Sequence, residues 1–346
     1  MSGEKAQPVS VISRRQFLAA GGVAAAGSAL PGCVNTDGED YGRPEGVPLS
    51  NFDKSSTAWE VTEGLDLTGK VAFITGCNSG LGYETMRVLT ARGATVIGAA
   101  RTMEKAQTAA DSIDGNVIPV VAELSDLSSL VACGEAVNKI GQPIDMLILN
   151  AGIMALQELE QVDGIEKHLY VNHLGHFVLT NRLLPWVLQS PEGRVVVVSS
   201  SGHSFAPDDG IQFDNLSGET DYDPWKMYGI SKLANGLFSV ELNKRLQGTN
   251  AVSNSIHPGV INTNLGRHFP WWQRVAASTI GWTFMKSTEA GAATQTYVAT
   301  APALEGYGGY YFSDCNPINP DPRMQDEAQA AQLWDVSVDL TRDYLL

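Results

Sequence analysis

The stretch Val71-Ala72-Phe73-Ile74-Thr75-Gly76-Cys77-Asn78-Ser79-Gly80-Leu81-Gly82 decides the fold. It begins as an apolar run, becomes a loop with three glycines, and leads into a segment with helical spacing. Glycines let the backbone turn sharply and approach a pyrophosphate, and the free N–H groups at a helix start point at the anion. A tight turn alone is the alternative, but the position between strand and helix favours dinucleotide binding. The residues predicted to contact the cofactor here are Gly76, Asn78, Ser79, Gly80, Leu81 and Gly82.

Short apolar runs alternate with helical stretches from Lys70 onward. The strand candidates are Val71–Thr75, Thr95–Ala99, Val117–Val121, Met146–Asn150, Val195–Ser199, Val252–Ile256 and Gly309–Phe312. Most are continuous apolar runs, which are typical of strands buried on both faces of a parallel sheet. The helical candidates include Ser125–Lys139, Val162–Leu188, Trp225–Leu246 and Thr288–Ala299. This alternation predicts an α/β fold, a Rossmann-type doubly wound parallel sheet, in a single domain over residues 65–346.

The composition argues against several classes of function. The chain has 346 residues, a formal net charge of −15 and no visible cluster of Lys and Arg such as nucleic-acid binding requires. Cys77, Cys133 and Cys315 lie far apart, which argues against a disulfide framework. His173 and His176 lack nearby Asp, Glu or Cys residues at ligand spacing, so we expect no metal site.

The N-terminal segment differs in character from the rest of the chain. Ser13-Arg14-Arg15-Gln16-Phe17-Leu18 is followed by an apolar run that ends in Leu30-Pro31-Gly32-Cys33. Residues 1–33 resemble a twin-arginine signal peptide with a lipoprotein cleavage box, in which Cys33 would carry the lipid. The resemblance implies export and attachment to a membrane at the periplasmic or cell-surface side; the alternative is a cytoplasmic protein with a disordered N-terminus. Residues 34–64 are predicted to be a linker, because Gly, Pro and acidic residues are frequent in their first part.

Tyr228-Gly229-Ile230-Ser231-Lys232 lies in a predicted helix, where a spacing of four puts Tyr228 and Lys232 on one face. A phenol has a reference pKa near ~10, and a neighbouring ammonium lowers that value. Such a pair can exchange a proton with an alcohol or carbonyl oxygen. The alternative for this motif alone is an amphipathic helix with a buried Tyr and a solvated Lys.

Other polar residues end strands at the same predicted sheet edge. Ser200 follows the strand Val195–Ser199, where its hydroxyl could hydrogen-bond a reacting oxygen. Asn150-Ala151-Gly152 ends another strand. Asn172 lies in the helix that follows, where its poor helix propensity indicates a hydrogen-bonding role.

In this order the motifs resemble the short-chain dehydrogenase/reductase family, and the match covers nearly all of residues 65–346. The Gly-x-x-x-Gly-x-Gly loop, Asn150-Ala151-Gly152 and His257-Pro258-Gly259-Val260 with Thr263 match family motifs. By this resemblance the catalytic tetrad is Asn172, Ser200, Tyr228 and Lys232. Lys232 would also hold the nicotinamide ribose, and Asn172 would order a water that links Lys232 to solvent. The resemblance also implies that the cofactor is bound by Asn150, Ala151, Gly152, Tyr228, Lys232, Pro258, Gly259, Val260 and Thr263.

Within the family the chain is similar to retinol dehydrogenases and to the oxidoreductase domain of WW-domain-containing oxidoreductase. This similarity rests on three segments, Asp214–Leu216, Tyr228–Leu237 and Tyr311–Cys315. Glu123-Leu124 departs from the usual Asp-Leu beside the adenine, and we expect both residues to contact the cofactor still. The segment Phe269–Trp272, together with Ile280, Trp282, Phe284 and Met285, lies where relatives carry a substrate lid, and is expected to cover an apolar substrate. The alternatives are ordinary core packing and a patch that touches a membrane.

The second strand ends Gly98-Ala99-Ala100-Arg101, with no acid to accept from a ribose 2′-OH. Arg101 offers donors for a 2′-phosphate, so NADP(H) is favoured over NAD(H). We therefore expect an oxidoreductase that transfers a hydride between NADP(H) and an apolar alcohol, aldehyde or ketone, and that could form oligomers. The alternative from another class is a non-catalytic NADP-binding redox sensor or scaffold.

Overall fold

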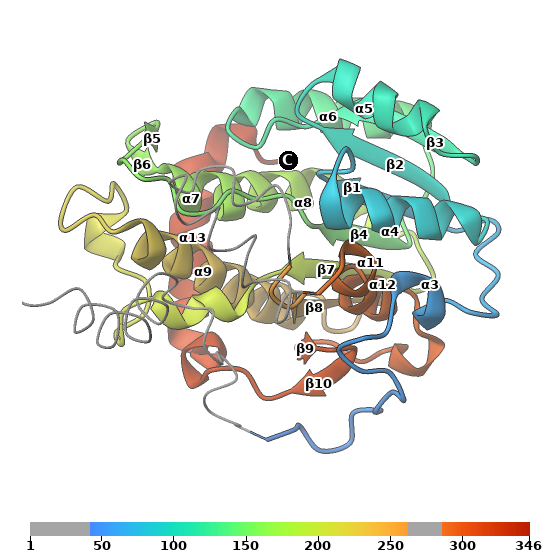
Figure 1. Cartoon of the computed structure of the whole chain (residues 1–346). Helices are drawn as coiled ribbons and strands as arrows, with labels where there is room; N and C mark the ends of the chain where they lie inside the picture. The colour runs from blue at the N-terminus through green and yellow to red at the C-terminus, as the bar shows by residue number, and fades with distance from the viewer. Residues whose placement is uncertain (1–41, 262–285) are drawn as a thin grey trace, which may run out of the picture.

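The structure, a computed structural model, describes residues 42–261 and 286–346. Its centre is an eight-stranded sheet in the order β10-β9-β8-β7-β4-β1-β2-β3, and helices cover both faces (Figure 1). All neighbouring strands of this sheet are parallel except β9 and β10. The predicted doubly wound parallel sheet is confirmed.

The strands match the predicted runs closely, and three short strands are additional. The central sheet contains β1 (Val71–Thr75), β2 (Thr95–Ala100), β3 (Val117–Val121), β4 (Met146–Leu149), β7 (Gly193–Val198), β8 (Ala251–His257), β9 (Tyr311–Ser313) and β10 (Asn316–Ile318). A separate antiparallel hairpin pairs β5 (Gln161–Val162) with β6 (Ile165–Glu166). The sequence pattern did not predict β5, β6 or β10.

The α-helices within the described residues are α3 (Ala58–Val61), α4 (Gly80–Ala91), α5 (Met103–Asp111), α6 (Leu127–Ile140), α7 (Lys167–Leu169), α8 (Gly175–Val187), α9 (Pro224–Arg245), α11 (Thr288–Gly291), α12 (Ala293–Thr300) and α13 (Glu327–Thr341). Short 3-10 turns lie at Ser201–Phe205, Phe213–Asn215, Pro302–Leu304, Pro322–Gln325 and Arg342–Tyr344. None of these helices is long and apolar enough to cross a membrane.

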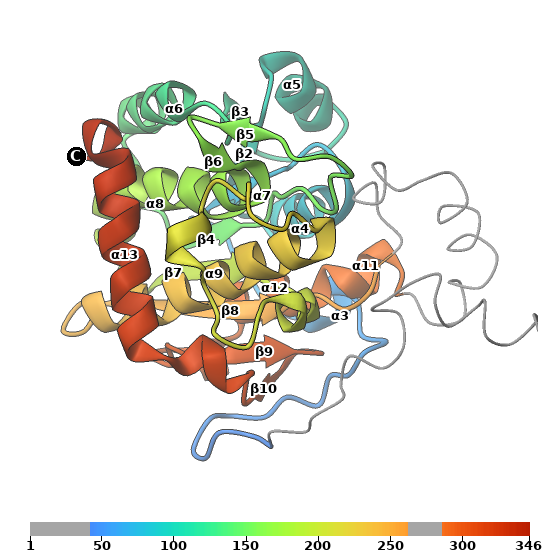
Figure 2. The ribbon, with the colours of Figure 1, turned by 90° about the vertical axis from the view of Figure 1, so that its left-hand side faces the viewer.

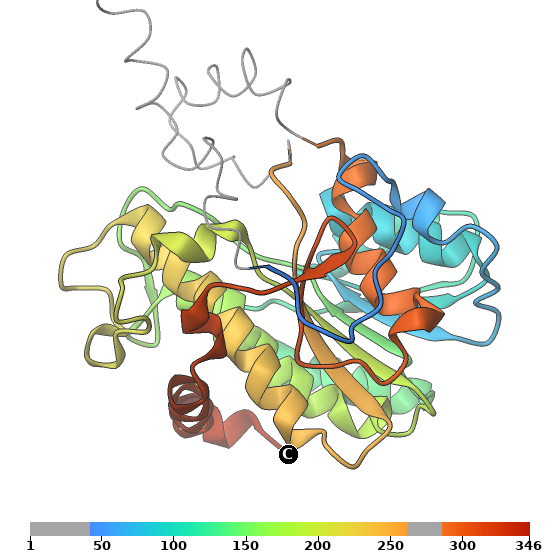
Figure 3. The same ribbon diagram turned by 90° about the horizontal axis from the view of Figure 1, so that it is seen from below.

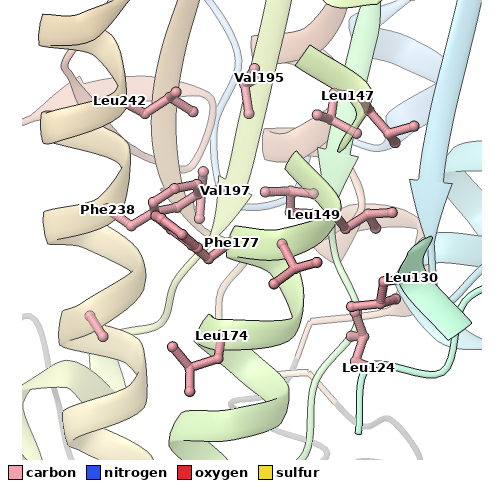
Figure 4. Close-up of a cluster of buried hydrophobic side chains, with 14 of the residues drawn as sticks. Leu124, Leu130, Leu147, Leu149, Leu174, Phe177, Val195, Val197, Phe238 and Leu242 are labelled. Atoms are coloured by element: carbon pink, nitrogen blue, oxygen red, sulfur yellow. The ribbon is translucent and has the colours of Figure 1, made fainter. Parts of the chain in front are cut away.

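Alternate side chains of each strand enter opposite cores, as the two-residue repeat of a strand requires. On one face the strands pack against α6, α8 and α9, with Leu147, Leu149, Val195, Val197, Phe177 and Phe238 among the buried residues (Figure 4). On the other face they pack against α4, α5 and α12, with Ala72, Ile74, Ile148, Val196 and Val298. Burial on both faces explains why the strands are continuous apolar runs.

The order of strands indicates where a ligand would bind. β1 pairs with β2 on one side and with β4 on the other, so the chain winds away from β1 in both directions. In open α/β sheets, ligands bind outside the carboxyl ends of the strands at this reversal. The glycine loop follows β1 and Asn150 follows β4, so both lie at that place.

The last long helix, α13, covers helices of the first core from outside (Figure 2). Its Trp334 packs edge-on to Phe177 of α8 at 5.0 Å and stacks on Phe238 of α9 at 5.9 Å between ring centroids. Arg245 lies over the same indole, with its guanidinium carbon 4.2 Å from the ring centroid. The C-terminal region thereby becomes part of the single domain.

Residues 42–64 differ from the linker that their composition predicted. They run beside the C-terminal strands and then along α12 (Figure 3). Ser50 donates to Asn316 and Cys315, and Phe52 packs edge-on to Tyr297 of α12. Val47, Ala58 and Val61 are buried. A few apolar residues are enough to order this polar segment, because they pack against a core that the domain already provides.

The stretch 162–188, predicted as one helix, consists of several elements. It begins in the β5–β6 hairpin, passes through α7 and a π-helical turn, η1 (Tyr170–Leu174), and only then enters α8. The apolar spacing continues through all of them, so the pattern could not reveal the change. The π-helical turn carries Asn172, and single π turns inside α-helices are frequent at functional sites.

Among the buried histidines of the described residues, three have strongly lowered pKa values. His173 and His176 are each 1% exposed, and His257 is 8% exposed. Burial lowers the pKa of His173 to about 3 and that of His176 to about 4, with a smaller contribution from neighbouring charges. Burial likewise lowers the pKa of His257 to about 3. These imidazoles therefore stay neutral in the folded protein at pH values at which they would be charged in the unfolded chain.

We predict that the free energy of unfolding falls as the pH drops from about 6.5 towards 4, because only the unfolded chain takes up protons on these histidines. Each unit of pKa difference corresponds to about 1.4 kcal/mol. His173→Gln should flatten this dependence, since its amide can still donate to Ser337, which bonds His173 Nε2. Denaturant titrations at several pH values measure the slope; an unchanged slope in the variant would contradict the prediction.

Candidate active site

The glycine loop is held tightly against the segment that follows β4. Gly76 and Gly80 have φ values of +73° and +57°, in the left-handed region that favours glycine. A Cβ on Gly82 would lie 2.4 Å from the Gly76 carbonyl oxygen and 2.6 Å from Asn150 Nδ2. Any side chain at Gly82 would force the loop and Asn150 apart, so the close packing explains the third glycine.

The loop leads directly into α4, which begins at Gly80. Ser79 is the N-cap residue of this helix, but its side chain makes no hydrogen bond to the first turn. The N–H groups of the first turn thus remain able to bind an anion, as at other dinucleotide sites. The cradle fits the pyrophosphate of a nicotinamide cofactor.

Thr75, the last residue of β1, joins the loop to Asn150 and Ala151. The backbone N–H groups of Asn150 and Ala151 donate to Thr75 Oγ1 at 2.9 and 3.0 Å. Asn150 Nδ2 also donates to the Thr75 carbonyl oxygen at 2.9 Å. The Asn-Ala-Gly segment is therefore positioned by the strand that carries the glycine loop.

His176 extends this network, a role that its sequence context did not predict. Its Nδ1 lies 3.0 Å from the backbone oxygen of Asn172, which can only accept, so Nδ1 carries the proton. Its Nε2 therefore accepts from the Thr75 hydroxyl, at 3.0 Å. His176 connects β1 to the π-helical turn, and no spacing signal in the sequence could have revealed this contact.

Asn172 uses its whole side chain to hold neighbouring segments. Its Oδ1 accepts from Ile153 N at 2.8 Å, and its Nδ2 donates to Ile153 O at 3.0 Å and Ser231 Oγ at 2.9 Å. A Cβ on Gly152 would lie 3.0 Å from Asn172 Oδ1 and 3.6 Å from Lys232 Nζ. The side chains of Asn172 and Lys232 therefore converge at Gly152.

Ser200 and Tyr228 meet where β7 ends and α9 begins. The Ser200 hydroxyl accepts from Gly202 N at 3.0 Å and hydrogen-bonds the Tyr228 hydroxyl. Two histidines fix the backbone around Ser200: His203 Nδ1 donates to the Ser200 carbonyl, and Ser201 N donates to His257 Nδ1. A Cβ on Gly202 would lie 2.6 Å from the Tyr228 ring, so a glycine is needed for the tyrosine to approach.

Lys232 lies one turn after Tyr228 in α9, and its Nζ donates to the Val198 carbonyl oxygen at 3.1 Å. Burial lowers the pKa of Lys232 to about 8. Burial also raises the pKa of Tyr228 to about 12, although the hydrogen bond from Ser200 opposes this shift. The Lys232 ammonium lies 5.8 Å from the centre of the Tyr228 ring. The expectation that Lys232 lowers the pKa of Tyr228 stays a prediction.

The remaining predicted cofactor residues line the same sheet edge. Arg101 is exposed directly after β2. Glu123 follows β3, and its carboxylate accepts from the backbone and hydroxyl of Ser125, while Leu124 is buried.

Pro258, Gly259 and Val260 follow β8, and Val260 O accepts from Lys286 N at 2.8 Å. Lys286 in turn forms an ion pair with Asp314 beyond β9. Thr263 and the predicted lid residues between 269 and 285 lie outside the described residues. The structure thus brings together the four tetrad residues, the glycine loop and the Asn-Ala-Gly segment at one edge of the sheet.

The family model described as short chain dehydrogenase matches residues 70–273. The chain belongs to the short-chain dehydrogenase family. Enzymes of this family use nicotinamide cofactors and act on alcohol and carbonyl groups of small molecules, so this chain is an oxidoreductase of that type. The predicted resemblance is confirmed.

Two curated relatives show where in the family the chain lies. It is 40% identical over 306 residues to WW domain-containing oxidoreductase of Pongo abelii. This match covers 85% of this chain and 73% of the relative. It is 39% identical over 286 residues to retinol dehydrogenase 14 of Mus musculus, covering 78% and 85%. Among solved structures, a protein from Mycobacterium paratuberculosis matches with a TM-score of 0.67 and 34% identity, over 83% of this chain and 98% of that chain.

A second family model, the signal sequence of the twin-arginine translocation pathway, matches residues 11–31. This match agrees with the resemblance of the Arg14-Arg15 segment to such a signal. It indicates export by the twin-arginine route.

Proposed function

We propose that the protein is an NADP-dependent oxidoreductase that interconverts a carbonyl and an alcohol on an apolar small molecule. The observation that carries the proposal is the meeting of Ser200, Tyr228 and Lys232 beside Gly152 and the glycine loop. The bound cofactor would supply or accept the hydride, and the protein's contribution is orientation and proton transfer.

Tyr228 holds the proton that the reaction needs. Its hydroxyl bonds to Ser200, so a substrate oxygen placed between them would accept from both groups. Ser200 polarises that oxygen, and the fixed backbone around Ser200 keeps the donor in place without reorganisation. Lys232 holds the ribose and supplies positive charge behind the phenol.

Burial raises the pKa of Tyr228 to about 12, so its hydroxyl is protonated at neutral pH in the protein alone and can donate to a carbonyl oxygen. In the opposite direction the deprotonated hydroxyl would accept the proton of an alcohol.

NADP is proposed over NAD because of the end of β2. The residues Gly98, Ala99 and Ala100 offer no carboxylate to a ribose hydroxyl, and Arg101 follows with its side chain exposed. An apolar substrate is proposed because the similar proteins include one named retinol dehydrogenase. A non-catalytic NADP-binding sensor is the rival function, and all four tetrad residues in place speak against it.

We predict that Tyr228→Phe lowers kcat by about a hundredfold to ten-thousandfold, because it removes the positioned proton donor. NADPH affinity should stay near the wild-type value, since the ring is fixed by packing. Turnover of a panel of carbonyls, followed by cofactor absorbance, is the measurement. Tyr297→Phe, which removes the hydroxyl of a buried tyrosine in the other core, is the control. A Tyr228→Phe protein with wild-type kcat would exclude the assigned role.

We predict that Arg101→Ala weakens NADPH binding by about 1.5–3 kcal/mol, because a charge-assisted hydrogen bond to the 2′-phosphate is lost. NADH affinity should change little. Arg101→Lys keeps the charge without the planar fork, so its NADPH affinity should lie between those of the wild type and of Arg101→Ala. Fluorescence titration with both cofactors measures this; equal losses for NADPH and NADH would contradict it.

We also propose that the protein leaves the cytoplasm folded with NADP bound, and stays attached to a membrane through a lipid on Cys33. Changing Arg14 and Arg15 to Lys should leave the precursor inside the cell. Cys33→Ser should abolish labelling with a lipid precursor and release the protein from membranes, because several acyl chains hold a protein far more firmly than one. Cys133→Ser, at a buried position, is the matched control and should keep the label. Wild-type protein found soluble in the cytoplasm with residues 1–32 intact would contradict export.

A further inference from the structure

A buried acid–imidazole pair lies next to the candidate active site and takes no part in the chemistry described above. Glu166 Oε1 and His168 Nδ1 are 2.6 Å apart, and both side chains are fully buried. Glu166 Oε2 accepts from Leu169 N at 3.0 Å. Burying such a pair costs free energy unless its hydrogen bonds are complete. The groups that complete those hydrogen bonds therefore indicate what the pair does.

The hydrogen bonds of His168 assign its proton. Leu156 N donates to His168 Nε2 at 3.2 Å, so Nε2 is an acceptor and Nδ1 carries the hydrogen. Nδ1–H then donates to the Glu166 carboxylate. Glu166 thereby keeps the imidazole in the one tautomer that can receive the Leu156 N–H.

Leu156 ends the segment 153–156, which directly follows the Asn-Ala-Gly segment. Ile153 is held by Asn172, and Ala155 has a φ of +49°, a left-handed conformation that a non-glycine residue adopts only when neighbours impose it. Leu156 O accepts from the Tyr222 hydroxyl at 2.7 Å. The bond to His168 is thus one of the contacts that fix this strained segment on both sides of Leu156.

His168 also touches the catalytic tyrosine. Its ring packs edge-on to the Tyr228 ring, with 6.3 Å between centroids and an interplanar angle of 71°. Tyr228 is 5% exposed, so the His168 imidazole forms part of the wall that sets the orientation of the phenol. One side chain therefore contacts both the 153–156 segment and the ring whose hydroxyl meets Ser200.

We propose that Glu166 and His168 are positioning residues that hold Leu156 and the Tyr228 ring in the arrangement needed for proton transfer. The inference rests on the proposed function of Tyr228. Glu166 acts through His168: it selects the tautomer, and the imidazole then fixes the Leu156 backbone and one face of the phenol. Displacement of a reacting group by about 1 Å can cost a hundredfold in rate, so a loss of this contact is expected to appear in kcat.

Two substitutions separate the two hydrogen bonds of His168. In His168→Gln the side-chain carbonyl can reach the position of Nε2 and accept from Leu156 N, while the donor to Glu166 is lost. In His168→Asn the shorter amide can donate to Glu166, while the acceptor for Leu156 is lost. The Gln variant should be the less stable of the two, because it leaves a buried carboxylate short of a donor.

We expect the order of activity to be the reverse of the order of stability. His168→Asn should lower kcat by about tenfold to a hundredfold and leave the Kd for NADPH unchanged. It should also speed hydrogen–deuterium exchange in peptides spanning residues 153–158. His168→Gln should keep most of the activity and the wild-type exchange, although it unfolds at a lower temperature. His173→Gln, a buried histidine on the α13 side, is the control that changes stability without changing kcat.

A role in stability alone predicts the opposite result. The proposal is overturned if kcat follows the thermal stability of the two His168 variants, or if His168→Asn changes neither kcat nor exchange. If the wild-type protein reduces no carbonyl with NADPH or NADH, the proposed function of Tyr228 fails. The exchange of residues 153–158 then still decides whether His168 positions Leu156.

Discussion

The candidate site depends on the hydrogen bonds of one group, the hydroxyl of Thr75. It accepts from the backbone of Asn150 and Ala151 and donates to His176, so one oxygen joins β1, the end of β4 and helix α8. All these groups are buried or half-buried, and a buried polar group left unpaired is costly. The position of the glycine loop is therefore tied to that of α8 by the need to satisfy a few hydrogen bonds.

The same principle extends outward from the π-helical turn. The carbonyl of Asn172, in the π turn, accepts from His176, while the Asn172 side chain holds Ile153 and Ser231. Ser231 donates in turn to Tyr228 O within α9. Asn172, Ser200 and Tyr228 come from segments far apart in the sequence, and hydrogen bonds between these segments help to orient them.

Much of this arrangement could be predicted from the sequence, because the cradle and the tetrad require particular residue types at particular spacings. Gly82 must be small where it meets Gly76 and Asn150, and Tyr228 and Lys232 must share a helix face.

The features that could not be predicted from the sequence depend on tertiary contacts. The apolar spacing of residues 162–188 continues through a hairpin and a π turn, and residues 42–64 are ordered by packing on the domain. Glu166 and His168 are two residues apart, a spacing that would separate them on a helix; they meet because α7 starts only at Lys167.

The path of residues 42–52 has a consequence for how molecules of this protein meet one another. β10 is the last strand of its sheet, and such an edge can pair with a strand of another chain. Pro317 has no N–H to offer in the middle of β10. The side chain of Asn316 bonds to the backbone of Ser50 and Phe52, and Asn319 N donates to Gly42 O just beyond the strand. The proline and the neighbouring residues 42–52 therefore disfavour pairing of this edge with a strand of another chain, which limits edge-to-edge aggregation of the folded protein.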